Sequence, residues 1–230
     1  MDLSNFLKMQ QETGLMVIFL ILVIYDIFGS VRSKKWLHPT VCILFGIHTV
    51  AGFFVHSEGI AFGGMYVSSA MTVMMKNILN IATCFVLMQS GQWLNSEPAL
   101  KQREGEFYTL TAVTLLGMYL MISAGNFMML YIGVETASLP LACLAAYNKY
   151  RERSAEAGAK FILISALSSG IMMFGLSYLY GATGTLYFSD MSSLVSGSAM
   201  TLFGFVFFFA GLAFKISLVP FHLWTADVYE

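Results

Sequence analysis

The sequence predicts an all-α protein, a polytopic bundle of about seven transmembrane helices. Of its 230 residues, 57% are hydrophobic and 11% are charged, and the mean hydropathy is +0.73. Soluble chains carry about 25% charged residues, so this balance indicates an integral membrane protein. The apolar residues come in long continuous runs, which suit helices that cross a hydrocarbon core of roughly 30 Å. They do not form the short alternating segments of a membrane β-barrel.

Seven apolar runs are long enough to span a membrane. The first lies close to the N-terminus, but no basic segment precedes it and no small-residue cleavage pattern follows it. We therefore expect a retained span rather than a signal peptide. The seven expected spans are residues 13–29, 39–57, 72–94, 107–125, 127–147, 158–180 and 199–219.

Two connections between these spans carry local signals. Ala124, Gly125 and Asn126 accept tight-turn geometry, so the fourth and fifth spans should form a hairpin. Ser154 is the expected N-cap of the sixth helix, with Glu156 in its first turn. Small residues then recur along that helix and permit close packing in lipid: Ser165, Ser168, Ser169, Gly170 and Gly175.

Basic residues gather in alternate connections, after the first, third and fifth spans. The intervening connections hold only Lys76, at the edge of the third span, and the N-terminal tail holds Lys8. The positive-inside rule therefore predicts that the basic connections are cytoplasmic and that the N-terminus lies outside. The basic residues are Arg32, Lys34, Lys35, Lys101, Arg103, Lys149, Arg151 and Arg153.

The sequence offers little support for metal, disulfide or nucleic-acid chemistry. Cys42, Cys84 and Cys143 fall inside expected helices, with no CxxC pair and no histidine at ligand spacing, so we expect them to be small buried side chains. No phosphate loop, nucleophile triad or nucleic-acid patch is present. The net charge of -1 says nothing about partners.

Ionisable side chains inside membrane spans are costly and therefore informative. Five are candidates, and three of them have an ordinary explanation. Asp26 is expected to pair with Arg32 or Lys34 at the end of the first helix. Lys76 and Lys160 lie near helix ends, from which a lysine can extend to the headgroup layer.

Glu135 and Lys215 are the remaining two candidates. Glu135 lies near the middle of the fifth span, more than about 10 Å from either end at 1.5 Å per residue. A carboxylate at that depth must be protonated or paired, and Lys215 is the plausible cation. Two such groups titrate as a coupled pair, which is the property of a proton switch.

Each of these two residues is followed five positions later by a proline, Pro140 or Pro220. Proline lacks the N–H that would bond the carbonyl four residues earlier, so it bends or breaks the helix there. Irregular backbone at membrane depth is tolerated where it is buried in protein or lines a wet cavity. His222, just after Pro220, can relay a proton near neutral pH. The other histidines have no such constellation and are expected to be structural: His38, His48 and His56.

Two stretches together resemble a known family. "YIGVETASLPLACLAAYNKYRERSAEAGAKFILISALSSGIMMFGLSYLYGATGTLYF" and "GLAFKISLVPFHLWTADVYE" are similar to subunit N of the bacterial proton-pumping NADH:quinone oxidoreductase, respiratory complex I, whose mitochondrial counterpart is subunit 2. The resemblance extends over residues 107–230. It implies an antiporter-like subunit fold with a three-helix region at 1–95 and an incomplete first antiporter-like repeat at 96–230, made of the fourth to seventh helices. Related chains continue through a second, inverted repeat, so the sequence is expected to be truncated before it.

The resemblance also implies a function and residue roles. Glu135 and Lys215 match the coupled pair of a proton half-channel, Lys160 the lysine of the sixth helix, and His222 the histidine after the proline of the seventh. The chain would be a proton-translocating subunit of the NADH:quinone oxidoreductase in the bacterial inner membrane, surrounded by lipid and by other membrane subunits. It would hold no redox cofactor, because quinone, FMN and iron–sulfur clusters belong to other subunits. Two alternatives remain open: a subunit of a multisubunit sodium/proton antiporter, or a truncated scaffold that conducts nothing.

Overall fold

The computed structural model describes residues 3–29, 36–55, 58–194 and 197–229. The seven expected apolar helices are present in the expected order. Five are long and apolar enough to cross a membrane, and the other two, α4 and α11, are shorter apolar helices of 16 and 17 residues. The seven are α2 (Gln10–Phe28), α4 (Leu37–Gly52), α5 (Ala70–Leu94), α7 (Glu104–Ile122), α8 (Phe127–Ala145), α9 (Glu152–Thr183) and α11 (Ala199–Lys215).

Short elements that were not expected from the sequence join these helices. Strands β1 (Gly59–Ala61) and β2 (Tyr66–Ser68) form an antiparallel hairpin around the 3₁₀ turn η1 (Phe62–Gly64). Gly63 and Gly64 of this turn have positive φ, which glycine adopts without steric cost. The remaining short helices are α1 (Leu3–Leu7), α6 (Pro98–Lys101), α10 (Phe188–Leu194) and α12 (Leu223–Tyr229).

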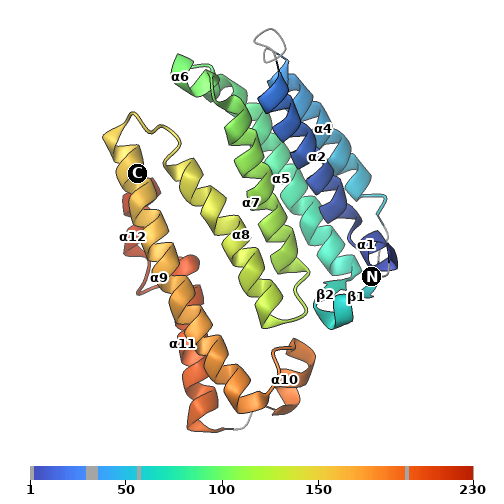
Figure 1. Ribbon diagram of the computed structural model, residues 1–230, viewed down its shortest axis with the longest axis vertical. Coiled ribbons are helices and arrows are strands. Elements are labelled where there is room, and N and C mark those ends of the chain that lie inside the picture. The colour runs from blue at the N-terminus through green and yellow to red at the C-terminus, as the bar shows by residue number, and fades with distance from the viewer. Residues whose placement is uncertain (1–2, 30–35, 56–57, 195–196, 230) are drawn as a thin grey trace.

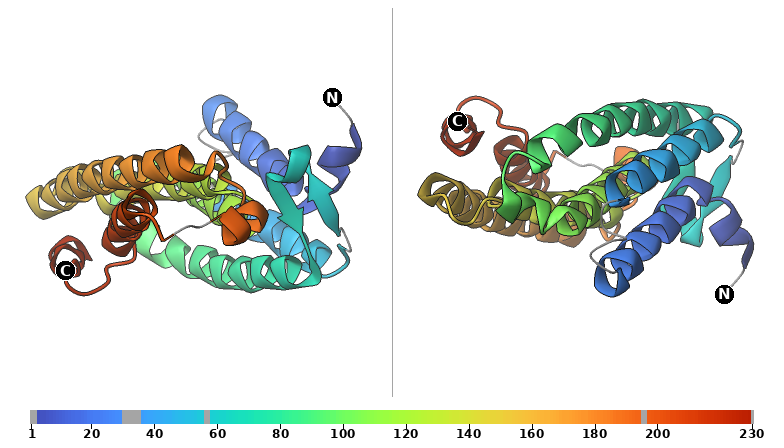
Figure 2. Two further views of the ribbon diagram at one scale, coloured as in Figure 1. Left: turned by 90° about the horizontal axis from the view of Figure 1, so that it is seen from below. Right: turned by 90° about the horizontal axis from the view of Figure 1, so that it is seen from above.

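The helices form a sheet-like row rather than a closed ring. The helices α2, α4 and α5 lie on one side, the hairpin of α7 and α8 lies in the middle, and α9, α11 and α12 lie on the other side (Figures 1 and 2). The connections from α5 to α7 and from α8 to α9 are at one end of the bundle, and the β-hairpin and α10 are at the opposite end (Figure 1). The basic residues of those two connections therefore share one end, as the positive-inside pattern requires.

Small residues set the closest helix approaches. Gly175 of α9 faces the backbone of Phe208 and Gly204 in α11, and Gly117 of α7 faces the backbone of Ala137 in α8. A side chain at Gly175 or Gly117 would meet that backbone, so these pairs of helices pack in contact along their axes. This is the packing that small residues permit in lipid.

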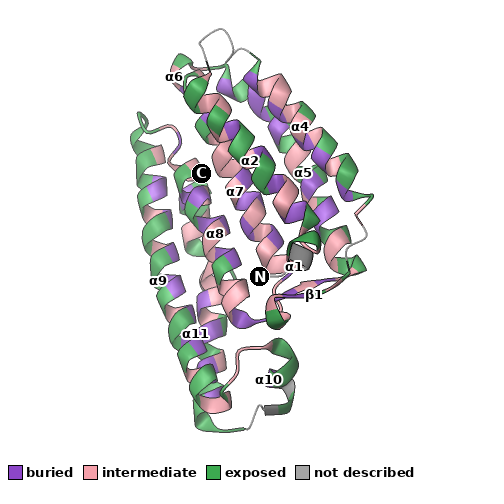
Figure 3. Ribbon diagram, turned by 45° about the vertical axis from the view of Figure 1, so that its right-hand side comes forward, coloured by how far each residue is buried: buried purple, intermediate pink, exposed green. Residues whose placement is uncertain are grey.

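The long helices each carry an outward apolar face. Exposed residues alternate with buried ones along α4, α9 and α11 (Figure 3), and large apolar side chains such as Leu163 and Leu202 are 70% and 65% exposed. Buried residues such as Phe45 and Leu115 belong to the core between helices. Apolar exposure on this scale is that of a surface that faces lipid.

The turn between α7 and α8 confirms the expected hairpin. The α8 helix begins directly after Asn126, whose side chain accepts a hydrogen bond from the Met129 N–H at 2.7 Å. The expected cap of α9 is wrong: the helix begins at Glu152, and the Ser154 hydroxyl donates instead to the Ala145 carbonyl at 2.9 Å. That bond joins α9 to the end of α8, and Ser154 lies inside the first turn, with Arg151 at the N-cap position.

The expected burial of the cysteines is also wrong in part. Cys143 is exposed, and Cys42 and Cys84 are only partly buried. All three lie in helices, where an outward position faces lipid and a small apolar side chain can be tolerated without burial in protein. The ion pair expected between Asp26 and Arg32 or Lys34 involves residues outside the described ranges.

Candidate functional site

The structure brings Glu135 and Lys215 together. Glu135 lies midway along α8 and Lys215 is the last residue of α11. The Lys215 Nζ is 3.0 Å from Glu135 Oε1, and the two side chains are 9% and 22% exposed. The charges are thus largely removed from the surface and paired with each other, as buried charges must be.

Three serines complete the surroundings of this pair. The Lys215 Nζ donates to Ser138 Oγ at 3.1 Å and to Ser165 Oγ at 2.5 Å. The Ser169 hydroxyl makes hydrogen bonds to Glu135 Oε1 and to the Ser165 carbonyl. Ser138 follows Glu135 by three residues on α8, and Ser165 and Ser169 are four apart on α9, so each set lies on one helix face.

The role of these serines as hydrogen-bond partners of the pair was not predicted from the sequence. Ser165 and Ser169 were expected only to allow close helix packing, although their spacing of four residues was a usable signal. Gly175, on the same helix, does pack closely against α11. One face of α9 therefore serves both helix packing and hydrogen bonding to the Glu135–Lys215 pair.

The helical backbone ends directly after Lys215. The Ile216 N–H still bonds to the Leu212 carbonyl, but the chain then turns and becomes helical again only at α12. The Trp224 indole N–H donates to the Phe214 carbonyl at 3.1 Å and so ties α12 back to the last turn of α11. The expected break near Pro220 is therefore present, whereas α8 continues through Pro140.

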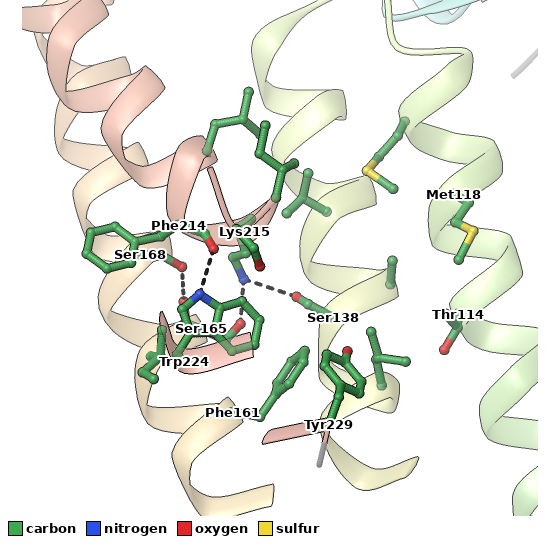
Figure 4. A pocket seen from close by; sticks show the side chains of 18 residues that line it. Thr114, Met118, Ser138, Phe161, Ser165, Ser168, Phe214, Lys215, Trp224 and Tyr229 are labelled. Carbon is green, nitrogen blue, oxygen red and sulfur yellow. Dashed lines mark hydrogen bonds between the residues drawn. The ribbon is translucent and has the colours of Figure 1, made fainter. Parts of the chain in front are cut away.

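A cavity of about 310 Å³ adjoins Lys215 (Figure 4). It lies among α7, α8, α9 and α11, and α12 closes one side with Trp224 and Tyr229. Its polar groups include Lys215, Ser138, Ser165 and Ser168, although most of its lining is apolar, and Thr114 and Met118 belong to its α7 wall. Its volume is large enough to hold water, which needs polar partners of this kind.

Lys160 and His222 lie apart from this pair. The Lys160 Nζ is 2.6 Å from Asp227 and 2.6 Å from Glu156, and its side chain is 37% exposed. It lines a second, more polar cavity near Glu97 and α12 rather than the one beside Lys215. His222 is exposed and does not line the cavity beside Lys215.

A second buried ion pair was missed by the sequence analysis. Lys76 was expected to extend to the membrane surface, but its side chain is 1% exposed and its Nζ lies 2.5 Å from Glu12 Oε1. The prediction is wrong because Glu12, on α2, provides a buried partner 64 residues earlier. His48 was expected to be structural, without a group of chemically active residues around it. Its Nε2 lies 3.2 Å from the Tyr119 hydroxyl, in the same region as the Glu12–Lys76 pair.

Among the described residues, no group of three or more histidine, cysteine, aspartate or glutamate side chains is arranged to hold a metal ion. Separately, the Glu135–Lys215 contact places a carboxyl group and an amine, an acid and a base, within hydrogen-bond distance of each other.

Sequence comparison identifies relatives of this chain. The model of the family described as "NADH:quinone oxidoreductase/Mrp antiporter, TM" matches residues 124–230. The chain is 55% identical over 232 aligned residues to NADH-quinone oxidoreductase subunit N of Azobacteroides pseudotrichonymphae genomovar. CFP2. This chain is homologous to subunit N. The subunit N of Phocaeicola vulgatus is 47% identical to it over 230 residues.

This chain spans about half the length of the curated relatives that it matches. The alignments with the Azobacteroides and Phocaeicola proteins cover 100% of this chain and 48% of each relative. Among solved structures, a chain of respiratory complex I from Thermus thermophilus with bound aureothin has a TM-score of 0.76 at 24% identity. That match covers 95% of this chain and 47% of the other. The likeness shows a shared fold.

Proposed function

We propose that this chain contributes the Glu135–Lys215 pair to proton translocation in a membrane-bound NADH:quinone oxidoreductase. The observation that carries the proposal is the 3.0 Å contact between the two charges, at the end of a broken helix and beside a partly polar cavity. Homology to subunit N supports the choice of complex. The oxidation of NADH and the reduction of quinone take place on other subunits, which hold FMN, iron–sulfur clusters and quinone.

The pair works as a coupled acid and base. In the paired state Glu135 is a carboxylate and Lys215 is an ammonium, and each stabilises the charge of the other. When a proton reaches Glu135, the attraction weakens and Lys215 is held by Ser138 and Ser165 alone. A change in the separation of α8 and α11 therefore changes the proton affinity of both groups together.

Lys160 and His222 take part on the route to or from the pair. Lys160 connects α9 to α12 through Asp227, and α12 also forms a wall of the cavity beside Lys215. A shift of α12 would therefore change both the Lys160–Asp227 contact and the cavity beside Lys215. His222 lies in the non-helical segment between α11 and α12, where it is open to a proton donor.

The same proposal includes the membrane in which the chain lies, its orientation there and its partners. The chain lies in the bacterial inner membrane with its N-terminus outside and the basic connections in the cytoplasm. Its partners are other membrane subunits of the oxidoreductase and the lipids around it. Protons then move from the cytoplasmic side outward.

Paired substitutions in the intact complex test this function. Glu135→Gln and Lys215→Met each remove one charge with little change in size, and Glu106→Gln removes an exposed carboxylate from the first turn of α7 as a control. Proton uptake into proteoliposomes and quinone reductase activity are measured together. We expect both substitutions in the pair to abolish proton translocation and the control to retain it. Normal translocation in Glu135→Gln and Lys215→Met would favour a scaffold role.

The family description also names antiporters, so exchange of sodium for protons is the second candidate. Co-purification separates the two functions. A complex that retains flavin and iron–sulfur proteins supports the oxidoreductase, and a complex without them supports the antiporter.

A further inference from the structure

A second cluster of charged and polar groups lies at the other side of the bundle, within α2, α4, α5, α7 and the β-hairpin. Its centre is the Glu12–Lys76 pair, with side chains 2% and 1% exposed. The Tyr66 hydroxyl of β2 lies 3.0 Å from both Glu12 carboxylate oxygens and 3.1 Å from the Lys76 Nζ. This centre is more deeply buried than the Glu135–Lys215 pair.

The three groups form a closed triangle of hydrogen bonds. The Lys76 ammonium donates to Glu12 and to Tyr66, and Tyr66 donates to Glu12. Burial, and then the Glu12 carboxylate, raise the pKa of Tyr66 well above its ordinary value. The hydroxyl therefore keeps its proton and can both accept from the lysine and donate to the carboxylate.

Further polar groups extend the cluster along the helices. Asn80 follows Lys76 by one helical turn on α5, and its side-chain oxygen accepts from the Tyr119 hydroxyl of α7. His48 of α4 meets the same hydroxyl, and the Lys76 Nζ lies 5.7 Å from the centre of the Tyr119 ring. The titratable groups beside Lys76 thus come from α2 (Glu12), β2 (Tyr66) and α7 (Tyr119), and His48 of α4 lies next to Tyr119.

Two buried amide atoms in this region have no hydrogen-bond partner among the described residues. They are Asn80 Nδ2 and Gln11 Oε1, in side chains that are 0% and 3% exposed. A buried donor or acceptor without a partner is costly, and water normally satisfies such groups. Asn80 Nδ2 and Gln11 Oε1 are therefore two positions near the ion pair where a polar atom can bond to water.

The cluster is one helix away from the cavity beside Lys215. The α7 helix carries Tyr119 into the cluster and presents Thr114 and Met118 to the cavity. At the end of the bundle, Tyr66 also lies 3.4 Å from the carbonyl of Lys8 in the N-terminal segment. Tyr66 thus connects the buried carboxylate with the region near the surface.

We propose that Glu12, Lys76 and Tyr66 form a second proton-binding site, outside the helices that hold Glu135 and Lys215. The site has two states that differ by one proton. In one, Glu12 is a carboxylate and Lys76 an ammonium. In the other, an O–H bond of a hydronium ion has broken and an O–H bond has formed on Glu12, directly or through Tyr66, while Lys76 remains an ammonium that donates to Tyr66. Water supplies the proton, burial disfavours the charged carboxylate and the ammonium favours it.

Infrared difference spectroscopy of the intact complex during a pH titration tests this site. The double variant Glu12→Gln/Lys76→Met removes both charges at once, so no unpaired charge remains buried, and Glu97→Gln is the control. We expect the wild type and the control to show a protonated-carboxyl C=O band that the double variant lacks. A double variant with the wild-type carboxyl bands would overturn the proposal and leave the pair as a structural clamp.

Tyr66→Phe provides an independent test in a variant that keeps both charges. It removes the bridging hydroxyl and retains the ring that packs beside Lys76. We expect the pH midpoint of the Glu12 band to shift, whereas an unchanged midpoint contradicts the proposed site. These infrared measurements need no enzyme turnover, whereas the function proposed for Glu135 and Lys215 is tested by proton translocation. A negative result for one proposal can therefore be told apart from a negative result for the other.

Discussion

The Lys215 Nζ lies 3.0 Å from Glu135 Oε1, although 80 residues separate the two in the sequence. The contact joins the end of one apolar helix to the middle of another, and serines on α8 and α9 hold the ammonium from two further directions. The position of the charge therefore depends on three helices at once.

The serine ligands of Lys215 provide the first prediction. Ser165→Ala removes a 2.5 Å hydrogen bond to the ammonium, and a bond to a charged group contributes about 1.5–3 kcal/mol. We expect slower proton translocation, by about tenfold if about 1.4 kcal/mol is lost. Proton uptake into proteoliposomes measures the change. Ser168→Ala is the matched control, because Ser168 lines the same cavity but bonds to the Ser165 carbonyl. Equal effects of the two changes would contradict the prediction.

The contact between α9 and α11 provides the second prediction. Gly175→Ala would place a methyl group against the backbone of Phe208, and overpacking costs typically about 1–3 kcal/mol. We expect a lower melting temperature of the purified complex. Gly170→Ala, on the same helix, meets no atom within 4 Å and should leave stability unchanged or raise it. If Gly175→Ala proves as stable as Gly170→Ala, the two helices are not packed as closely as described.

The Glu12–Lys76 pair gives a third prediction, about stability. Glu12→Gln alone leaves a buried ammonium without its carboxylate, and loss of one partner from a buried pair costs about 3–5 kcal/mol. Replacement of both partners should cost much less. Denaturation in detergent, with the amount of assembled complex as a second readout, compares the single and double variants. A single variant as stable as the double variant would show that the two charges do not depend on each other.

Lys160 supports a prediction that separates stability from activity. Its ion pairs with Glu156 and Asp227 are partly exposed, and exposed pairs contribute little, so Lys160→Gln should leave the stability of the complex nearly unchanged. If Lys160 lies on the proton route, translocation should fall while the melting temperature stays the same. Arg151→Gln, which breaks another exposed pair, serves as the comparison. Unchanged translocation in Lys160→Gln would remove this lysine from the route.

Local sequence signals predicted the helices and their order well. Long apolar runs identified all seven apolar helices, and the residues around Asn126 and Pro220 identified a tight turn and a break. Each of these features depends on residues that are close in the sequence. Helix boundaries were less accurate: α9 begins at Glu152, before Ser154, and the Ser154 side chain bonds to the end of the preceding helix.

The surroundings of the charged residues were harder to predict. Lys76 can extend to the surface or remain buried, and only the distant Glu12 decides between the two. A serine such as Ser165 is suited both to close helix packing and to hydrogen bonding. Only the position of Lys215 in the structure shows that it forms a hydrogen bond. The sequence identifies Glu135 and Lys215 as unusual, but the groups that satisfy them come from other helices.

The end of α11 at Lys215 has a consequence for the charge itself. The last turn of a helix carries a partial negative charge from its unpaired carbonyls, and a cation placed there gains about 0.3–1 kcal/mol. Lys215 occupies that position and therefore has a fixed counter-charge in the backbone, besides the variable one on Glu135. If Glu135 takes up a proton, the backbone counter-charge stays in place beside the lysine. The helix break thus gives Lys215 a fixed electrostatic partner in addition to the carboxylate.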